Sequence, residues 1–365
     1  MKNKLLTTTA IASLLSVANF GAANAQTTVT GNLNLSYKAV TTDAKGSQTK
    51  ANSMRSFGKE TQINITNKGK LNNGMDYVAG FSIEHDGTEL SVSANTTNGN
   101  NMFSENVYMD FISGNTTLTI GADHIPNPDF EYINIVGMND PDEVVSGVAA
   151  QALGMVNNAG SPYQAFGFGV IQTLPNFGRV SAYYTPDSTN AAAGDSHGDF
   201  NTRATLLDSG QSRYELGFRG GLGVKGLDAG MYYNVAKAQG TSAATLSDAT
   251  GFKTGVKYTA GAITGAISYG ETENGATQNV NLKTKGIGLG YAIDKNLSVG
   301  INRAVTERNV SNTTTKFVDE KITTLSIGYN LGAIAVGLSA GNVEGAANTT
   351  NQDGKAVILQ LNTSF

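Results

Sequence analysis

The chain has no cysteine, no tryptophan and only three histidines among its 365 residues. Without cysteine it can form neither a disulfide framework nor a thiolate metal site. His85, His124 and His197 lie far apart in the sequence. A hydrolase would need a nucleophile with a histidine base, and the sequence around these histidines shows no such pattern. We therefore expect no metal site, no cofactor and no enzymatic activity.

Charge is also scarce. Charged residues make up 15% of the chain, against about 25% in typical soluble domains. Beyond residue 25, however, no apolar run approaches the roughly 20 residues that a membrane-spanning helix needs. Such a composition is typical of strands with one face in lipid and the other in water. The formal net charge of −4 is mild, so we expect no nucleic-acid partner.

The amino terminus has the pattern of a secretory signal. Lys2 and Lys4 precede an uncharged, mostly small or apolar stretch over residues 5–22, and Ala23-Asn24-Ala25 fits a small-x-small cleavage site. A membrane anchor is the alternative, but several threonines and serines interrupt the apolar stretch well before the length of a spanning helix. We expect residues 1–25 to be cleaved and residues 26–365 to form a single domain.

A two-residue alternation dominates the rest of the chain. Apolar residues share one face from Val29 to Tyr37 and from Met75 to Ile83, and no helical period competes. The pattern predicts sixteen strands, near residues 28–39, 56–67, 75–86, 103–112, 116–123, 163–173, 178–185, 212–220, 227–238, 251–259, 262–272, 284–292, 296–306, 320–330, 333–342 and 354–365. All six prolines fall between these segments, as they must if every strand is hydrogen-bonded on both sides.

The chain ends inside the last of these strands. Val357, Leu359, Leu361 and the terminal Phe365 share one face of it. An exposed strand edge promotes aggregation, and a closed barrel removes the edge by pairing the last strand with the first. The sequence therefore predicts an all-β protein, a transmembrane antiparallel β-barrel of about 16 strands.

Connections alternate between short turns and long polar loops, and this alternation predicts how the barrel is oriented in the membrane. Short turns mark the periplasmic rim of an outer-membrane barrel, and long loops lie outside the cell. Tyr258, Tyr291 and Tyr329 fall on the apolar face close to short turns, where an aromatic girdle is expected. The predicted location is the outer membrane, with its lipid as a partner.

A barrel of this size needs something to narrow it. Strands about 4.8 Å apart and tilted about 40° give a diameter of roughly 32 Å, too wide for side chains to fill. The segment from Asp123 to Pro162 is much the longest connection and holds four of the six prolines. Its apolar residues argue against a loop that only extends into water: Ile133, Ile135, Val136, Val144, Val145 and Val148. We predict that this loop folds inward as a constriction.

Charges of opposite sign fall on this loop and on the barrel wall. The loop has no lysine or arginine, and its acidic residues are Asp123, Asp129, Glu131, Asp140, Asp142 and Glu143. By parity, cations that face the lumen include Lys38, Arg179, Arg213, Arg219, Lys253 and Lys257. Opposed charges across a water-filled neck would set ion preference. The alternative is that the acids only solvate the loop and that the cations lie too far from the neck.

Two segments have the pattern of a strand-turn-strand unit: Gly286 to Lys295 with Leu297 following, and Asn64 to Gly74. Both resemble units of the general diffusion porins of Gram-negative outer membranes. The long loop departs from that family, with Asn127-Pro128-Asp129-Phe130-Glu131 in place of a Pro-Glu-Phe-Gly string. The resemblance implies a sixteen-stranded, trimeric channel for passive diffusion of ions and small hydrophilic solutes. It also makes Phe365 the signal recognised by the barrel assembly machinery. A substrate-selective channel for a sugar or other nutrient, and an adhesive or structural barrel, are the alternatives.

Overall fold

The computed structural model describes residues 25–44, 52–85, 87–88, 102–121, 133–136, 141–145, 166–185, 211–238, 248–274, 280–311 and 313–365. The predicted signal segment, residues 1–25, lies almost wholly outside this part of the chain. Among the described residues, no helix is both long and apolar enough to cross a membrane.

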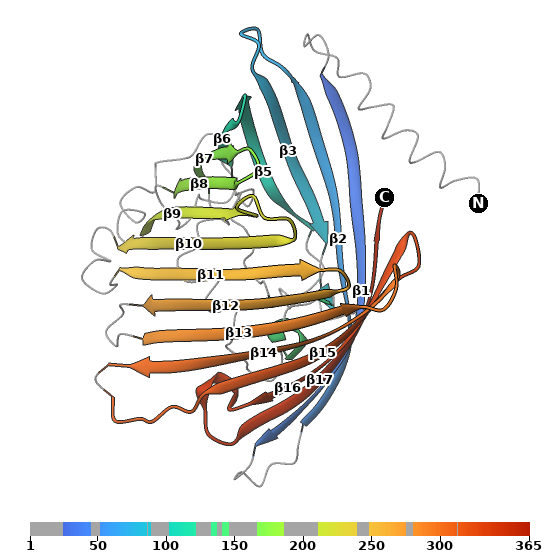
Figure 1. The fold of residues 1–365 in the computed structure, drawn as a ribbon, viewed down its shortest axis with the longest axis vertical. Coiled ribbons are helices and arrows are strands. Elements are labelled where there is room, and N and C mark those ends of the chain that lie inside the picture. The colour runs from blue at the N-terminus through green and yellow to red at the C-terminus, as the bar shows by residue number, and fades with distance from the viewer. Residues whose placement is uncertain are drawn as a thin grey trace.

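The described chain is one antiparallel sheet in which each strand pairs with its neighbours in sequence (Figure 1). Its strands are β1 (Gln26–Ala44), β2 (Asn52–Lys70), β3 (Asp76–His85), β4 (Gly87–Thr88), β5 (Met102–Ser113), β6 (Thr116–Gly121), β7 (Gly167–Leu174), β8 (Gly178–Thr185), β9 (Gln211–Gly220), β10 (Leu227–Ala238), β11 (Ala249–Ala260), β12 (Ile263–Asn274), β13 (Val280–Ala292), β14 (Leu297–Val310), β15 (Glu320–Asn330), β16 (Ile334–Glu344) and β17 (Gln352–Ser364).

The seventeen strand segments make sixteen barrel strands, because β4 continues β3. Both pair with β2 in one register, Gln62 with Glu84 and Gly58 with Thr88. The predicted all-β barrel of about 16 strands is confirmed.

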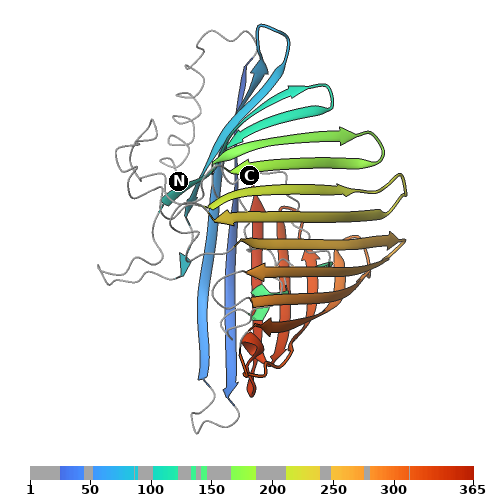
Figure 2. The same cartoon turned by 90° about the vertical axis from the view of Figure 1, so that its left-hand side faces the viewer.

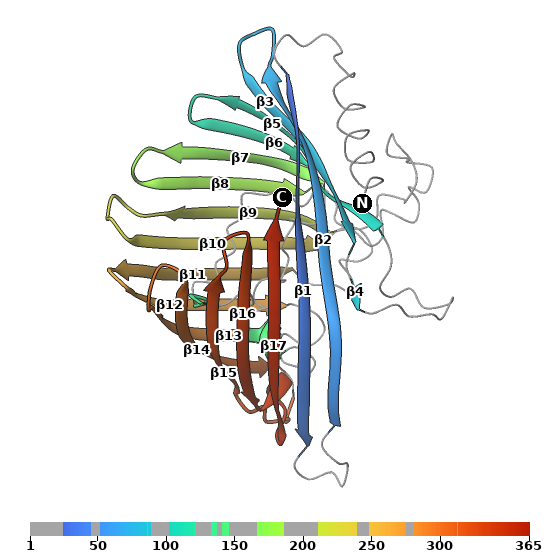
Figure 3. The same ribbon diagram turned by 90° about the vertical axis from the view of Figure 1, so that its right-hand side faces the viewer.

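The barrel closes where the sequence predicts. β17 pairs antiparallel with β1, from Asn32 opposite Ser364 to Ala44 opposite Gln352, and the two strands lie side by side in Figure 3. Gly31 and Phe365 extend the ladder by exchanging two backbone hydrogen bonds of 2.8 and 2.9 Å. No described edge of the sheet is left without a neighbouring strand.

Side chains alternate between an apolar outer face and a lumen-facing side. Leu216, Met231 and Ile267 are 61%, 51% and 60% exposed on the outer face, whereas Gly217 and Ala266, beside two of them in sequence, are buried on the inner side. A belt of exposed leucine, isoleucine, valine and aromatic residues would be unfavourable in water but matches hydrocarbon.

Short turns join the strands in pairs at one end of the barrel (Figure 2). The turns after β11 and β15 contain Gly261 and Gly332 with φ of 62° and 89°, a left-handed conformation that favours glycine. The predicted short turns are therefore confirmed. The first hairpin differs from the prediction, because β1 continues to Ala44 and β2 begins at Asn52, both inside the connection left between the predicted strands 28–39 and 56–67. Backbone pairing, for example of Thr41 with Ser53, continues there without an apolar face.

Candidate functional site: the lumen and the segments inside it

Two described pieces of the long connection between β6 and β7 lie against the inner wall. The first is residues 133–136, and the second is the short helix α2 (Pro141–Val145). Ile133, Val144 and Val145 are completely buried and Val136 is 6% exposed. Apolar residues of the predicted constriction loop are therefore packed against protein, on the lumen side of the sheet.

The first piece packs where the wall carries glycine. A methyl group built on Gly286 would lie 2.8 Å from Ile133 Cδ1, and one on Gly300 would lie 2.8 Å from Val136 Cβ. Ile135 packs beside Tyr232 and Ala266. Because glycine has no Cβ, the backbone of the loop approaches the sheet closely over β12, β13 and β14.

The helix α2 extends this contact to the closing strands. Val145 joins an apolar cluster with Val40 of β1, Ile322, Val343, Ala346 and Ala356. Lys38 of β1 donates a hydrogen bond from Nζ to the backbone carbonyl of Glu143. Together the two pieces contact the inner wall at β10 and from β12 through β17 to β1.

A second loop, residues 345–351 between β16 and β17, folds onto the same cluster. Its 3₁₀ turn η3 (Ala346–Asn348) places Ala346 against Val145. Buried Glu320 accepts a hydrogen bond of 2.7 Å from the Ala347 backbone NH, and Asn348 Nδ2 donates to the carbonyls of Thr306 and Val318 at 2.7 and 2.9 Å. These buried polar groups fix the loop beside α2.

The predicted acidic residues are only partly within the described chain. Asp123, Asp129, Glu131 and Asp140 lie outside the described residues. Asp142 belongs to α2, but its side chain is outside the described part, whereas Glu143 is exposed. Glu143 is thus the one predicted acid whose surroundings the structure describes.

The predicted basic residues lie at different depths. Lys38 meets α2. Two of the cations lie away from the short turns. Arg213 is on the long-loop half of β9. Lys253 is opposite Tyr232 and is 4% exposed. Arg179, Arg219 and Lys257 instead lie next to the short turns that end β7, β9 and β11. The structure does not gather the six cations into one ring.

Sequence reasoning missed the glycines that receive the loop and the buried Glu320 and Asn348. Gly286, Gly288 and Gly290 had a visible signal, since they occupy three successive inner positions of β13. Glycine at successive inner positions of a strand indicates that another backbone approaches closely. Nothing in the sequence around Glu320 or Asn348 marked them.

Within the described residues, no group of three or more histidine, aspartate or glutamate side chains could hold a metal ion. The described inner wall carries fixed charges, hydroxyls and amides. A closed antiparallel barrel with an apolar outside, a polar inside and loop segments in its lumen has the architecture of a transmembrane channel.

Comparison with known proteins identifies the family. The sequence profile of the Gram-negative porins matches residues 7–309, so the chain belongs to the Gram-negative porin family. It is an outer-membrane channel for passive diffusion, and its family and fold are those of non-enzymatic channels. No curated protein sequence matches the chain significantly.

Solved structures of porins share the fold at low sequence identity. An anion-selective porin from Comamonas acidovorans is 13% identical, with a TM-score of 0.62 over 94% of this chain and 100% of that one. A loop L8 deletion mutant of OmpT, an outer-membrane protein of Vibrio cholerae, is 11% identical, with a TM-score of 0.62 over 93% and 99% of the two chains. A mutant of the Rh. blastica porin is 12% identical, with a TM-score of 0.59 over 93% and 100%.

Proposed function

We propose that this porin passes ions and small hydrophilic solutes through a lumen narrowed by the loop between β6 and β7. The observation that carries the proposal is the packing of residues 133–136 and α2 on the inner wall. An empty barrel of sixteen strands would be roughly 32 Å across. A loop held against one side reduces that opening.

In this proposal the loop's acidic residues and the wall's cations set the ion preference. Lys38 is the cation best placed for the role, because it contacts α2 directly. Fixed charge acts most strongly at the narrowest point, where screening by salt is least complete.

Conductance in planar bilayers tests the narrowing. Removal of residues 133–152 should raise single-channel conductance, because the barrel would lose its inward segment. Shortening the external connection over residues 191–208 is the control and should leave conductance unchanged. If a barrel without residues 133–152 folds and conducts like the unaltered protein, the loop does not narrow the pore.

A second measurement tests the charges of the neck. Replacing Asp129, Glu131 and Asp140 together by Asn, Gln and Asn should shift the zero-current potential in a salt gradient toward anions. The direction follows from the removal of fixed negative charge. A zero-current potential that stays the same would assign ion preference to other residues.

A substrate-selective channel remains the second candidate. Stacking of a sugar would need aromatic rings open to the lumen, and two of the inner tyrosines, Tyr183 and Tyr232, are only 4% and 6% exposed. Tyr183 instead donates a hydrogen bond of 2.6 Å to the carbonyl of Gly121. Saturable block of the current by one sugar would favour selectivity, and an absence of conductance would favour an adhesive or structural barrel.

The partners of the channel are also proposals. We expect a homotrimer in outer-membrane lipid, inserted by the barrel assembly machinery after cleavage of residues 1–25, and no catalytic activity. Migration of the unheated protein in detergent gels tests the trimer. A monomeric unheated band that still conducts would contradict it.

A further inference from the structure

We propose that the outer face of β13 to β15 binds the phosphate group of a membrane lipid, with Arg303 and Lys321 as its cationic ligands. The lipid would lie in the leaflet nearer the long loops, with its acyl chains packed on the aliphatic side chains below Arg303. This site is on the outside of the barrel, whereas the loop segment 133–136 packs on the inner face of β13 and β14.

The strand register places Arg303 on the outer face of β14. It is opposite Ile287 of β13 and Thr323 of β15, and Ile287 is 58% exposed on the apolar side of the sheet. Its neighbours in sequence, Asn302 and Ala304, are buried on the inner side. Because side chains alternate between the two faces of a strand, the exposed Arg303 side chain faces the membrane.

Arg303 lies at the edge of the apolar surface. It is the seventh residue of β14, counted from Leu297 at the short turn. With about 3.3 Å per residue and a tilt of about 40°, it lies about 15 Å from the start of the strand, inside an apolar band of roughly 25 Å. A cation at that depth extends toward the headgroups or needs an anionic partner. The outer positions between it and the short turns are apolar on all three strands: Tyr291, Leu289 and Ile287, then Leu297, Val299 and Ile301, then Tyr329, Ile327 and Leu325.

Arg303 and Lys321 have no carboxylate partner in the described part of the wall. Neither side chain makes a hydrogen bond or an ion pair there. Lys285, the cation on the neighbouring strand, instead pairs with Glu307 at 2.8 Å. Glu344 is opposite Lys321 in the register of β15 and β16 but forms no ion pair with it. The counter-charge for Arg303 and Lys321 therefore has to come from outside the barrel wall.

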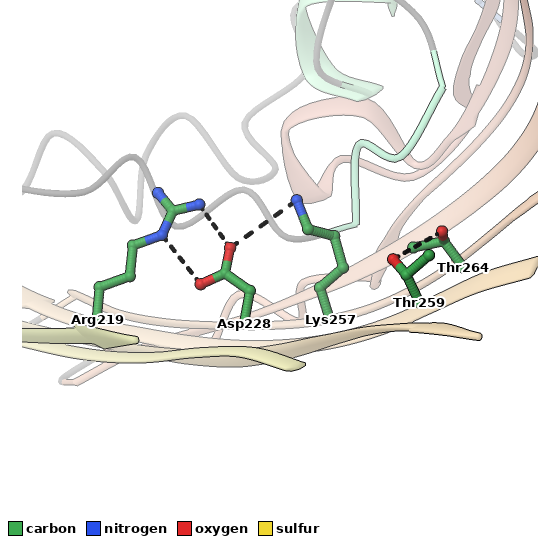
Figure 4. A network of polar contacts seen from close by, with 5 residues as sticks. All are labelled: Arg219, Asp228, Lys257, Thr259 and Thr264. Atoms are coloured by element: carbon green, nitrogen blue, oxygen red, sulfur yellow. Dashed lines mark hydrogen bonds and ion pairs between the residues drawn. The ribbon is translucent and has the colours of Figure 1, made fainter. Parts of the chain in front are cut away.

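Cations on the inner wall show the opposite arrangement (Figure 4). Arg219 donates to Asp228 from Nε at 3.1 Å and from Nη2 at 2.7 Å, and Lys257 Nζ lies 4.0 Å from the same carboxylate. These inner cations have an acidic partner within the wall itself, although water also surrounds them. Arg303 faces hydrocarbon without such a partner, and an unpaired charge is most costly there.

The positions around Arg303 allow several cations to reach one anion. Val305 is opposite both Lys285 of β13 and Lys321 of β15, and Arg303 is two residues before it on the same face. Each lysine is therefore diagonal to Arg303, about 7–8 Å away between backbones. Long side chains from these positions can converge on a phosphate group, and a guanidinium matches two of its oxygens.

The surface on the short-turn side of Arg303 suits acyl chains. Ile287, Ile301 and Leu325 are exposed aliphatic residues of the outer face next to it. A ligand that fits both parts has an anionic head toward the long loops and a hydrocarbon tail toward the short turns. This combination favours a lipid phosphate over a dissolved phosphate ion, which would gain nothing from the aliphatic surface.

Lipid retention by the purified protein tests the site. Native mass spectrometry of the mature protein in detergent with dimyristoylphosphatidic acid gives the affinity for the first bound lipid. The double variant Arg303→Gln with Lys321→Gln should weaken this affinity by about tenfold, because it removes two attractive charges. Arg303→Lys keeps a cation and should retain most of the binding. Lys295→Gln, in the short turn between β13 and β14, is the matched control and should bind like the parent.

Two further measurements separate the lipid from other occupants. Inorganic phosphate in excess should not displace the lipid, because it has no acyl chains; displacement would mean that the site binds a dissolved anion and would overturn the proposal. Heat-modifiable migration verifies that each variant folds. Unchanged lipid affinity in the double variant would also overturn the proposal, and loss of its oligomer at unchanged affinity would assign Arg303 and Lys321 to a contact between subunits. Because lipid retention is measured rather than current, failure of the narrowing loop and failure of this site give different results.

Discussion

At the scale of single residues, the face of the sheet decides what a position tolerates. Ile267 and Thr264 lie on the same strand, but Ile267 is 60% exposed on the apolar side while Thr264 bonds to Thr259 inside. The same two-residue period that revealed the strands therefore separates lipid-facing from water-facing positions. This part of the structure follows from local sequence, so it could be predicted without knowledge of the fold.

The first prediction concerns this contrast. Ile267→Lys should destabilise the barrel by about 2–4 kcal/mol, because the ammonium group would sit in hydrocarbon. Thr264→Lys is the matched control, since its side chain points into the lumen. Urea unfolding in lipid vesicles gives the free energies. Leu216 and Met231, also exposed on the outer face, should behave like Ile267. Equal tolerance at both kinds of position would contradict the assignment of inner and outer faces.

The second residue-scale prediction concerns the glycines beneath the loop. Gly300→Val should displace residues 133–136, because even the first carbon of the new side chain would lie 2.8 Å from Val136 Cβ. We expect altered single-channel conductance in a barrel that still folds. Gly265→Val is the control, because a Cβ at that position has no neighbour within 4 Å. If both variants conduct like the parent, the described contact does not position the loop.

At the scale of elements, the inner wall carries two inward loops that support each other. Val145 of α2 and Ala346 of η3 belong to one buried cluster, and Glu320 and Asn348 fix the second loop beneath it. The sequence predicted the inward loop between β6 and β7 from its apolar residues. It could not predict the support from residues 345–351, because that contact joins segments far apart in the chain and depends on buried polar bonds.

A third prediction tests this support. Asn348→Ala should lower the free energy of unfolding by about 1–3 kcal/mol, because the buried carbonyl of Thr306 and the partly buried carbonyl of Val318 would lose their donor. Thr349→Ala is the control, since the Thr349 hydroxyl makes an exposed bond of 3.3 Å to Ala347. Urea unfolding measures both variants. If Asn348 also supports α2, the variant should show noisier single-channel currents as well as lower stability. Steady currents in the variant would mean that Asn348 contributes to stability alone.

At the scale of the whole molecule, the barrel depends on one seam between β1 and β17. Phe365 completes it through two backbone bonds with Gly31, and its ring lies over that glycine, 2.6 Å from where a Cβ would be. The order of strands and the position of the seam were predictable, because every strand pairs with its chain neighbour. The distance of each wall cation from the rim of the barrel was harder to predict from the sequence. For Arg219 it could be read from the sequence, because the turn at residues 221–226 follows closely.

The fourth prediction concerns this seam. Deletion of Phe365 should reduce the yield of folded barrel, with a loss of about 1–3 kcal/mol from the two backbone bonds. Phe365→Tyr retains the ring and the backbone bonds and should fold normally. Heat-modifiable migration after insertion into vesicles gives the yield. Normal yield from the deletion variant would remove Phe365 from a role in assembly.

The first hairpin gives the wall an uneven height. β1 and β2 each contain 19 residues, and strands of that length tilted by about 40° rise roughly 48 Å, about twice the apolar band of roughly 25 Å. Figure 3 shows both strands extending beyond β17. The excess over β17 lies at the short-turn end, where residues 26–31 of β1 pair with residues 63–68 of β2. One side of that rim is therefore taller, and a solute leaving the barrel there passes a longer wall on this side.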